Sequence, residues 1–196
     1  MNGPEFLDED FFDISDAEIE FDLTAISAEP YFEYDNRRIS CSFTGHRIIT
    51  DEEKKTLLPA LKSTILYLLS QGVKEFHCGG AIGFDTLAAS VVFDVSREHP
   101  DIKLVLELPY ENQSCKWKEN QKKYYKFLKS KANEVNIHFK NPKNKEEAVK
   151  ALLGRNRILI DKSHYCVCYH KHEKGGTAYT VNYAKLHDVQ IINLAE

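Results

Sequence analysis

Two glycine-rich segments of the chain contain residues suited to binding a phosphate group. One, GGAIGFDTLAA, follows an apolar run, and the other, KGGTAYT, opens a stretch of helical period near the C-terminus. Glycine lets backbone amides approach an anion closely, and the N-terminus of the following helix offers unpaired N–H groups. The two segments together therefore favour a phosphate site over tight packing alone. The candidate ligands are Gly79, Gly80, Gly83, Gly175, Gly176, Thr177 and Thr180.

Basic residues close to these segments can neutralise a phosphate. Arg47 lies in FTGHR, directly after a predicted strand, and Arg155 and Arg157 form a second basic pair in GRNRILID. A guanidinium presents a planar fork of donors that suits phosphate. Surface ion pairs are the alternative for Arg155 and Arg157, and the sequence leaves both readings open. The segment FTGHR also contains the candidate binding residues Thr44, Gly45 and His46.

The nucleoside part of a ligand needs a stacking surface and a partner for its hydroxyl groups. Tyr110 or Trp117 can stack on a base, and packing in the core or at its rim is the alternative. Asp85 either contacts a ribose hydroxyl or caps its own helix. Two more residues complete the set of candidate binding residues: Thr86, next to Asp85, and Gln113, between Tyr110 and Trp117.

Residue types alone do not assemble a catalytic arrangement in this chain. The acid–base candidates are Glu111 and Asp85, and Glu107 is less favoured. The run CVCYHKH, residues 166–172, alternates metal-ligand types. On a strand, however, residues of one face lie about 6.5–7 Å apart, too far for several of them to reach one ion. We predict no metal site and no cofactor other than a nucleotide-type ligand.

From Arg38 onward, short apolar runs alternate with segments of helical period. The predicted strands are 39–43, 73–78, 102–108, 134–139, 164–169 and 189–193. The predicted helices are 51–71, where Thr50 and Glu53 form a capping box, and 85–97, 117–131, 146–160 and 178–186. This order predicts an α/β protein: a Rossmann-like, doubly wound, mostly parallel sheet with helices on both faces. Ligands of such folds bind outside the carboxyl ends of the strands, where the candidate residues lie.

The charge of the chain is divided between an arm and a domain. Residues 1–36 contain 12 Asp or Glu and no Lys or Arg, whereas the remaining 160 residues have 26 basic against 18 acidic residues, a net +8. We assign 1–37 to an acidic N-terminal arm and 38–196 to the folded domain. The arm interleaves acidic with aromatic and aliphatic residues, and the sequence leaves open whether it is disordered or docks on a basic surface.

Composition also bounds the compartment and the partners. Five cysteines and an acidic N-terminus without a long apolar run predict reduced thiols, no disulfide and no contact with a membrane. We therefore expect a cytoplasmic protein. A nucleic-acid or protein partner acting through the arm and a homo-oligomer both remain open, because an apolar helix stripe looks the same whether it packs on the sheet or on a second subunit.

Five segments, FTGHR, GGAIGFDTLAA, LPYENQSCKW, RNRILID and GGTAYTVNYA, resemble those of the SLOG superfamily, in order, over about residues 38–195. More narrowly, the chain is similar to its YpsA-like members, which are related to the DprA/Smf DNA-processing proteins and to the LOG phosphoribohydrolases. The resemblance implies a Rossmann-like sheet whose glycine loops bind nucleotides or nucleotide-derived ligands.

Two departures from the related families bear on chemistry. LOG enzymes have a PGGxGTxxE segment whose Glu takes part in cleaving the base from a nucleoside monophosphate. In the matching segment here, that position falls on Asn182 or Thr180, neither of which is a carboxylate. DprA proteins, which bind single-stranded DNA, have an arginine where Ile82 stands in GGAIGFDTLAA.

The function that these observations favour is the binding of a nucleotide or nucleotide-derived small molecule, for sensing or sequestration, at the glycine-rich loops. A hydrolase acting on the N-glycosidic or phosphate bond of such a ligand is one alternative. A single-stranded nucleic-acid or protein-binding module regulated by the acidic arm is the other.

Overall fold

The computed structural model of the protein describes residues 37–195. After a short 3-10 turn at Arg37–Ile39, strands and helices alternate as predicted. The strands are β1 (Ser40–Gly45), β2 (Glu75–Cys78), β3 (Lys103–Leu108), β4 (Glu134–Ile137), β5 (Tyr165–Tyr169) and β6 (Gln190–Asn193). The helices are α1 (Asp51–Ser70), α2 (Phe84–Ser96), α3 (Glu119–Lys131), α4 (Lys145–Asp161) and α5 (Gly176–Leu186). Apart from Arg37, the predicted arm lies outside the described residues.

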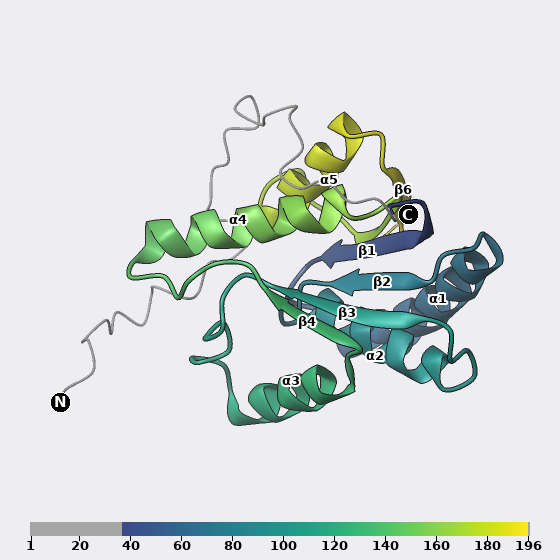
Figure 1. The fold of residues 1–196 in the computed structure, drawn as a ribbon, viewed down its shortest axis with the longest axis horizontal. Helices are drawn as coiled ribbons and strands as arrows, with labels where there is room; N and C mark the ends of the chain where they lie inside the picture. Colours follow the sequence, from purple (N-terminus) through teal and green to yellow (C-terminus); the bar gives the residue numbers. More distant parts are fainter. Residues whose placement is uncertain (1–36, 196) are drawn as a thin grey trace.

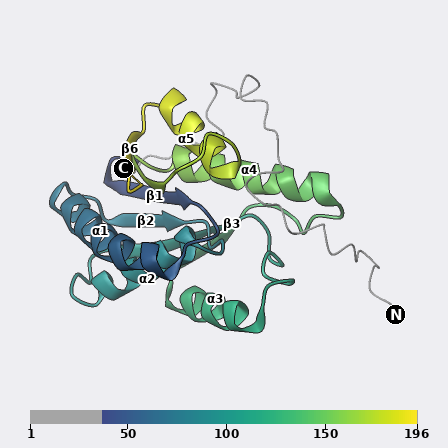
Figure 2. The same cartoon turned by 180° about the vertical axis from the view of Figure 1, so that it is seen from behind.

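The strands form one six-stranded sheet in the order β4-β3-β2-β1-β5-β6, and each recorded pair is parallel. Helices α1, α2 and α3 cover one face, and α4 and α5 cover the other (Figure 1). The view from behind shows the same two layers on either side of the sheet (Figure 2). The predicted α/β class, doubly wound with helices on both faces, is therefore confirmed.

The chain reverses its direction of winding between β1 and β5, which lie side by side with Gly45 opposite Tyr169. From β1 it crosses by α1 to β2, whereas from β5 it crosses by α5, on the other face, to β6. The connections that leave the carboxyl ends of these two strands diverge, and the crevice between them is where doubly wound folds bind ligands.

A local sequence signal sets the start of helix α1. In the capping box of α1, the Thr50 backbone N–H donates to Glu53 Oε2 at 2.7 Å, and the Glu53 N–H donates to Thr50 Oγ1 at 3.2 Å. Two starts differ from the prediction. Helix α5 begins at Gly176, because Gly175 adopts φ +94° and turns the chain into the helix at once. Helix α3 begins only at Glu119, so Trp117 lies in the preceding turn and not in a helix.

The two faces of the sheet have different chemistry. The face under α1 and α2 packs a large apolar core that includes Phe43, Phe76 and Phe84, all fully buried. The face under α4 and α5 has a smaller apolar cluster around Tyr183, and beside it the buried polar residues His77 and Glu107. None of the described helices is long and apolar enough to cross a membrane.

Candidate functional site

Two adjoining hollows lie at the carboxyl ends of β1, β2 and β3, and they share Arg47, Ala81 and Leu152 in their walls. The first, which we call the polar hollow, has a volume of about 460 Å³ when the open solvent at its mouth is included. The second, the aromatic hollow, has a volume of about 450 Å³ on the same basis. The predicted residues that line the polar hollow are Thr44, Gly45, Arg47, Asp85, Arg155, Gly176 and Thr177. Those that line the aromatic hollow are Arg47, Tyr110, Gln113 and Trp117.

Arg155 is a buried guanidinium in the wall of the polar hollow, with only 4% of its surface exposed. Its NH1 group donates to the Gly79 carbonyl and, at 3.5 Å, to the Glu107 carbonyl, and its Nε donates to Asn156 Oδ1 at 2.9 Å. A Cβ atom at Gly79 would overlap this guanidinium, so glycine is required there for close approach. Arg155 is therefore no surface residue, and the surface-ion-pair alternative is wrong for it.

Asp85 lies opposite Arg155, with 3.9 Å between its Oδ2 and the Arg155 NH1. Burial raises the pKa of the Asp85 carboxyl, and the neighbouring Arg155 opposes that shift. Burial disfavours the charged form of Arg155 as well, which for a cation lowers the pKa. Asp85 Oδ2 accepts a hydrogen bond from the Ala81 N–H at 3.4 Å, so the carboxyl group holds the glycine turn that precedes α2. The N-cap residue of helix α2 is Gly83, and no side-chain hydrogen bond caps the helix there, Asp85 included.

The N-terminus of α5 forms the opposite wall of the polar hollow. Its N-cap is Gly175, and within the described residues no side chain caps the helix. A Cβ added at Gly176 would meet no heavy atom within 4 Å, so this position borders open space. Thr177 lines the hollow, whereas the Thr180 hydroxyl donates to the Gly176 carbonyl at 2.8 Å inside the helix and lines neither hollow.

Aromatic and amide side chains form the second hollow. Tyr110 is 3% exposed, and burial raises the pKa of its phenol. The Trp117 ring meets Tyr125 edge-on, with 5.2 Å between ring centroids. Gln113 donates to the Tyr125 hydroxyl at 3.0 Å and to the Gly80 carbonyl at 3.4 Å, which ties the loop after β3 to the glycine turn. Gly80 packs closely against Leu108 and Gln113, since a Cβ added at Gly80 would lie 2.9 Å from the Leu108 side chain.

His46 joins the loops that follow β1 and β5. Its Nε2 accepts from the Lys171 N–H at 2.9 Å, and its carbonyl accepts from the Phe84 N–H at 3.1 Å. Gly83 faces the same segment, where an added Cβ would lie 2.5 Å from the His46 carbonyl oxygen. His46 and Gly83 therefore shape the site without lining either hollow.

The predicted residues Gly79, Gly80 and Gly175 line neither hollow, and three others also lie outside both. Arg157 projects from another side of α4 than Arg155, donating to the Tyr179 hydroxyl at 2.5 Å. The Thr86 hydroxyl donates to the Gly83 carbonyl at 3.0 Å, and Thr86 lines a separate surface groove. Glu111 is exposed, so of the two favoured acid–base candidates only Asp85 borders the polar hollow. Within residues 37–195, no three His, Cys, Asp or Glu side chains are grouped to hold a metal.

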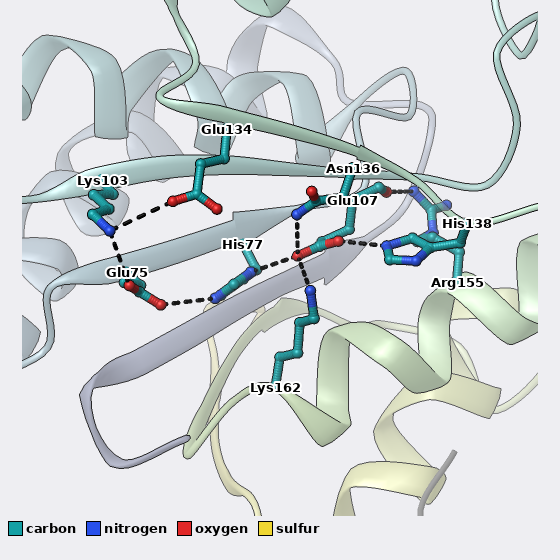
Figure 3. Close-up of polar contacts among 9 residues, drawn as sticks. All are labelled: Glu75, His77, Lys103, Glu107, Glu134, Asn136, His138, Arg155 and Lys162. Atoms are coloured by element: carbon teal, nitrogen blue, oxygen red, sulfur yellow. Dashed lines mark hydrogen bonds and ion pairs between the residues drawn. The ribbon is translucent and has the colours of Figure 1, made fainter. Parts of the chain in front are cut away.

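Sequence reasoning missed the buried charge network directly beneath the site (Figure 3). Glu107 is fully buried, with His77 Nδ1 at 3.0 Å and Lys162 Nζ at 2.9 Å from its Oε1, and His138 Nε2 at 2.5 Å from its Oε2. The backbone carbonyl of Glu107 also accepts from Arg155. The one signal in the sequence is a glutamate inside the apolar run of β3, and its partners come from β2, from the residue that follows β4 and from the end of α4.

The network makes stability depend on pH in two directions. Burial alone would raise the pKa of Glu107, but hydrogen bonds from His138, His77 and Lys162 hold it well below the ordinary 4.5. Burial alone would lower the pKa of His77, but the hydrogen bonds to Glu107 and Glu75 raise it above 6.5. Because the pKa of Glu107 is lowered, its carboxylate stabilises the fold above the pKa it has in the unfolded chain, and this contribution is lost in acid. Because the pKa of His77 is raised, its imidazole stabilises the fold below the pKa it has in the unfolded chain, and this contribution is lost in alkali.

We expect the free energy of unfolding to be greatest between roughly pH 5 and 6.5 and to fall on either side. Urea unfolding measured across this range checks the expectation. In the His77→Gln variant the decline above pH 6.5 should flatten while the decline in acid remains. An unchanged alkaline decline in that variant would show that His77 does not cause it.

The comparisons with known proteins agree with this architecture. Residues 46–192 match the YpsA family, described as the "YspA SLOG family". The chain belongs to this family. It is also similar to UPF0398 proteins of Bacillus cereus (strain B4264) and Bacillus thuringiensis (strain Al Hakam), each 32% identical over 127 residues, or 64% of this chain and 67% of the relative. The YpsA-like resemblance in the SLOG superfamily is therefore confirmed.

Solved structures show the same fold in DNA-processing proteins. The X-ray structure of DNA processing protein A (DprA) from Streptococcus pneumoniae superposes with a TM-score of 0.53 at 13% identity, covering 78% of this YpsA-family chain and 48% of that chain. DprA from Helicobacter pylori, in a structure described for its single-stranded DNA binding mode, gives 0.53 at 17% identity, covering 79% and 64%. The chain thus spans about half the length of the pneumococcal protein.

Proposed function

We propose that this YpsA-family protein binds a nucleotide or nucleotide-derived small molecule across the two hollows. The observation that carries the proposal is the polar hollow, where the buried Arg155 and the uncapped N-terminus of α5 face one space. A helix N-terminus favours an anion, and a guanidinium favours phosphate in particular. Gly176 leaves room for a phosphate to approach the backbone there.

The aromatic hollow suits the base of the same ligand. Tyr110 and Trp117 offer ring surfaces, and Ile82 adds apolar area. Arg47 borders both hollows, so one cation serves the phosphate and the nucleoside part. Asp85, in the polar hollow, is placed for a ribose hydroxyl.

The decisive experiment is to denature the purified protein, identify any released small molecule by absorbance and mass spectrometry, and offer it to fresh protein. Recovery of an intact nucleotide derivative supports a binding protein. Its conversion on re-addition would indicate a hydrolase, with Asp85 as the group to replace by asparagine. If no small molecule is released and the protein binds no nucleoside mono-, di- or triphosphate in calorimetry, the proposal is contradicted.

A bulky residue at position 176 should block the site without disturbing the fold. We expect Gly176→Val to weaken nucleotide affinity by about 10- to 100-fold, because its methyl groups occupy the space the phosphate needs. The thermal midpoint should change little, since a Cβ added at this position meets no heavy atom within 4 Å. Calorimetry and thermal unfolding together test this. Gly176→Ala is the graded control, and equal affinities for all three proteins would place the phosphate elsewhere.

Single-stranded nucleic acid is the second candidate, because of the fold shared with a DprA studied for that binding. The excess of 26 basic over 18 acidic residues beyond residue 36 would support it. Ile82, which lines the aromatic hollow, is a departure from the DprA pattern and removes a cation there. Oligonucleotide binding that weakens steeply between about 50 and 200 mM salt would favour this candidate. Binding of mononucleotides with a shallow salt dependence would favour the first.

A further inference from the structure

A third depression lies on α4, away from the two hollows. This groove, which we call the α4 groove, has a volume of about 1050 Å³ and runs between the helix and the segment that follows β4. Its apolar lining residues are Phe139, Pro142, Ala151 and Leu153. Its charged lining residues are Lys140, Lys143, Lys150 and Arg157, with Glu147 as the one carboxylate. An apolar floor with a mainly basic rim suits a segment that carries both apolar and acidic side chains.

The rim keeps much of its positive charge. Lys140 and Lys143 are exposed, and no ion pair is recorded for either within residues 37–195. Lys150 pairs with Glu146 at 2.6 Å, but both side chains are more than 70% exposed, so this pair is weak and screened. Arg157 lies over the rings of Tyr179 and Tyr183, which fixes its guanidinium without neutralising it.

The floor is fixed by close packing. Phe139 lies against Gly154 of α4, where an added Cβ would stand 2.5 Å from the ring. The aromatic ring can rest on the helix backbone only because position 154 has no side chain. The groove is therefore a built feature of the segment after β4 and not a gap between loose side chains.

We propose that the N-terminal arm of this same chain, residues 1–36, docks in the α4 groove. The arm contains 12 Asp or Glu and no Lys or Arg, and its segments FLDEDFFDISD and EIEFDL interleave carboxylates with Phe, Leu and Ile. These are the complements of a basic rim and an apolar floor. This inference does not depend on the proposed nucleotide site.

The point where the arm leaves the domain supports the proposal. Arg37 is anchored by donating to the Ser163 carbonyl at 2.8 Å and the His187 carbonyl at 2.5 Å. Ser163 directly follows Lys162, the C-cap of α4, so the arm joins the domain beside the end of the helix that carries the groove. The groove residues of α4 lie about 9–24 Å back along the helix, at about 1.5 Å per residue. A chain of 36 residues can span that distance several times over.

Covalent attachment makes this docking far more effective than the same contact between separate molecules. A short tether gives an effective concentration in the millimolar range, so even a weak contact is populated. Because the contact is mainly electrostatic, salt should weaken it. Helix α4 also carries Arg155 on its other side, so an occupied groove and the polar hollow would share one helix.

Carbodiimide cross-linking of the full chain tests the proposal, because the arm has no lysine and can contribute only carboxylates and the terminal amine. We expect amide links from arm carboxylates to Lys140, Lys143 or Lys150 in a product of monomer mass. Their yield should fall about fivefold or more at about 0.5 M NaCl, where the Debye length is near 4 Å. Links only to other lysines, or none, would overturn the proposal. Links in a product of twice the mass would assign the groove to the arm of a second copy.

A charge-reversed pair provides the matched control. In the Lys140→Glu, Lys143→Glu variant, digestion of the arm by a glutamate-specific protease should be about tenfold faster than in the unchanged chain, which corresponds to about 1.4 kcal/mol. The Lys123→Glu, Lys126→Glu variant makes the same charge change on α3, on the opposite face of the sheet, and should leave the rate unchanged. Equal digestion rates for the two variants would rule out docking at this groove.

Discussion

Replacing Arg155 with methionine should lower the affinity for a nucleoside phosphate about 100-fold and the free energy of unfolding by about 3 kcal/mol. The residue does two things at once. Its guanidinium supplies the buried positive charge of the polar hollow. It also satisfies the carbonyls of Gly79 and Glu107, the ends of two strands that would lose their donor in the variant. Calorimetric titration and urea unfolding measure the two effects separately.

A second variant separates binding from folding. In the Arg155→Met, Asp85→Asn double variant, neither charge of the buried pair remains, so much of the lost stability should return. The affinity for phosphate should not return, because the hollow has lost its buried guanidinium and keeps only that of Arg47. If the double variant regained both stability and affinity, the polar hollow would not be the phosphate site, and Arg155 would serve the fold alone.

Replacing Glu107 with alanine should destabilise the domain by about 3–5 kcal/mol, the largest effect on stability that we expect of a single substitution. The carboxylate is fully buried and contacts His77, His138 and Lys162 (Figure 3). Removing it takes one hydrogen-bonded counter-charge from the buried Lys162 ammonium and opens a void as well. Chemical unfolding of the variant at neutral pH measures the loss.

The matched control for this substitution is Glu111→Gln, four residues along the chain. Glu111 is exposed, so its replacement should change the free energy of unfolding by less than about 0.5 kcal/mol. The same variant tests the acid–base candidate that lies outside both hollows: any turnover of a nucleotide should survive it. A loss of activity in Glu111→Gln at unchanged stability would mean that the loop after β3 reaches the ligand in a way its position does not indicate.

The periodicity of the sequence cannot tell which of Arg155 and Arg157 faces the site. The two lie two positions apart, and at 3.6 residues per turn their side chains point about 200° apart around the helix. One of them must therefore face away if the other faces the site, but a basic pair in the sequence does not say which. The sheet determines which arginine faces the site, because Arg155 is the one that donates to the carbonyls of Gly79 and Glu107.

From the sequence alone we could predict the alternation of strands and helices, the capping box of α1 and the position of both glycine turns at the carboxyl ends of strands. Those features depend on contacts within a few residues or on the period of apolar side chains, which are local. The sequence did not reveal that Trp117 precedes its helix or that the Thr180 hydroxyl bonds within α5, although both features are local. The contacts of Glu107 with two histidines and a lysine, by contrast, arise from the tertiary structure. Those contacts join residues up to 55 positions apart, and a parallel sheet brings them together only through its strand order.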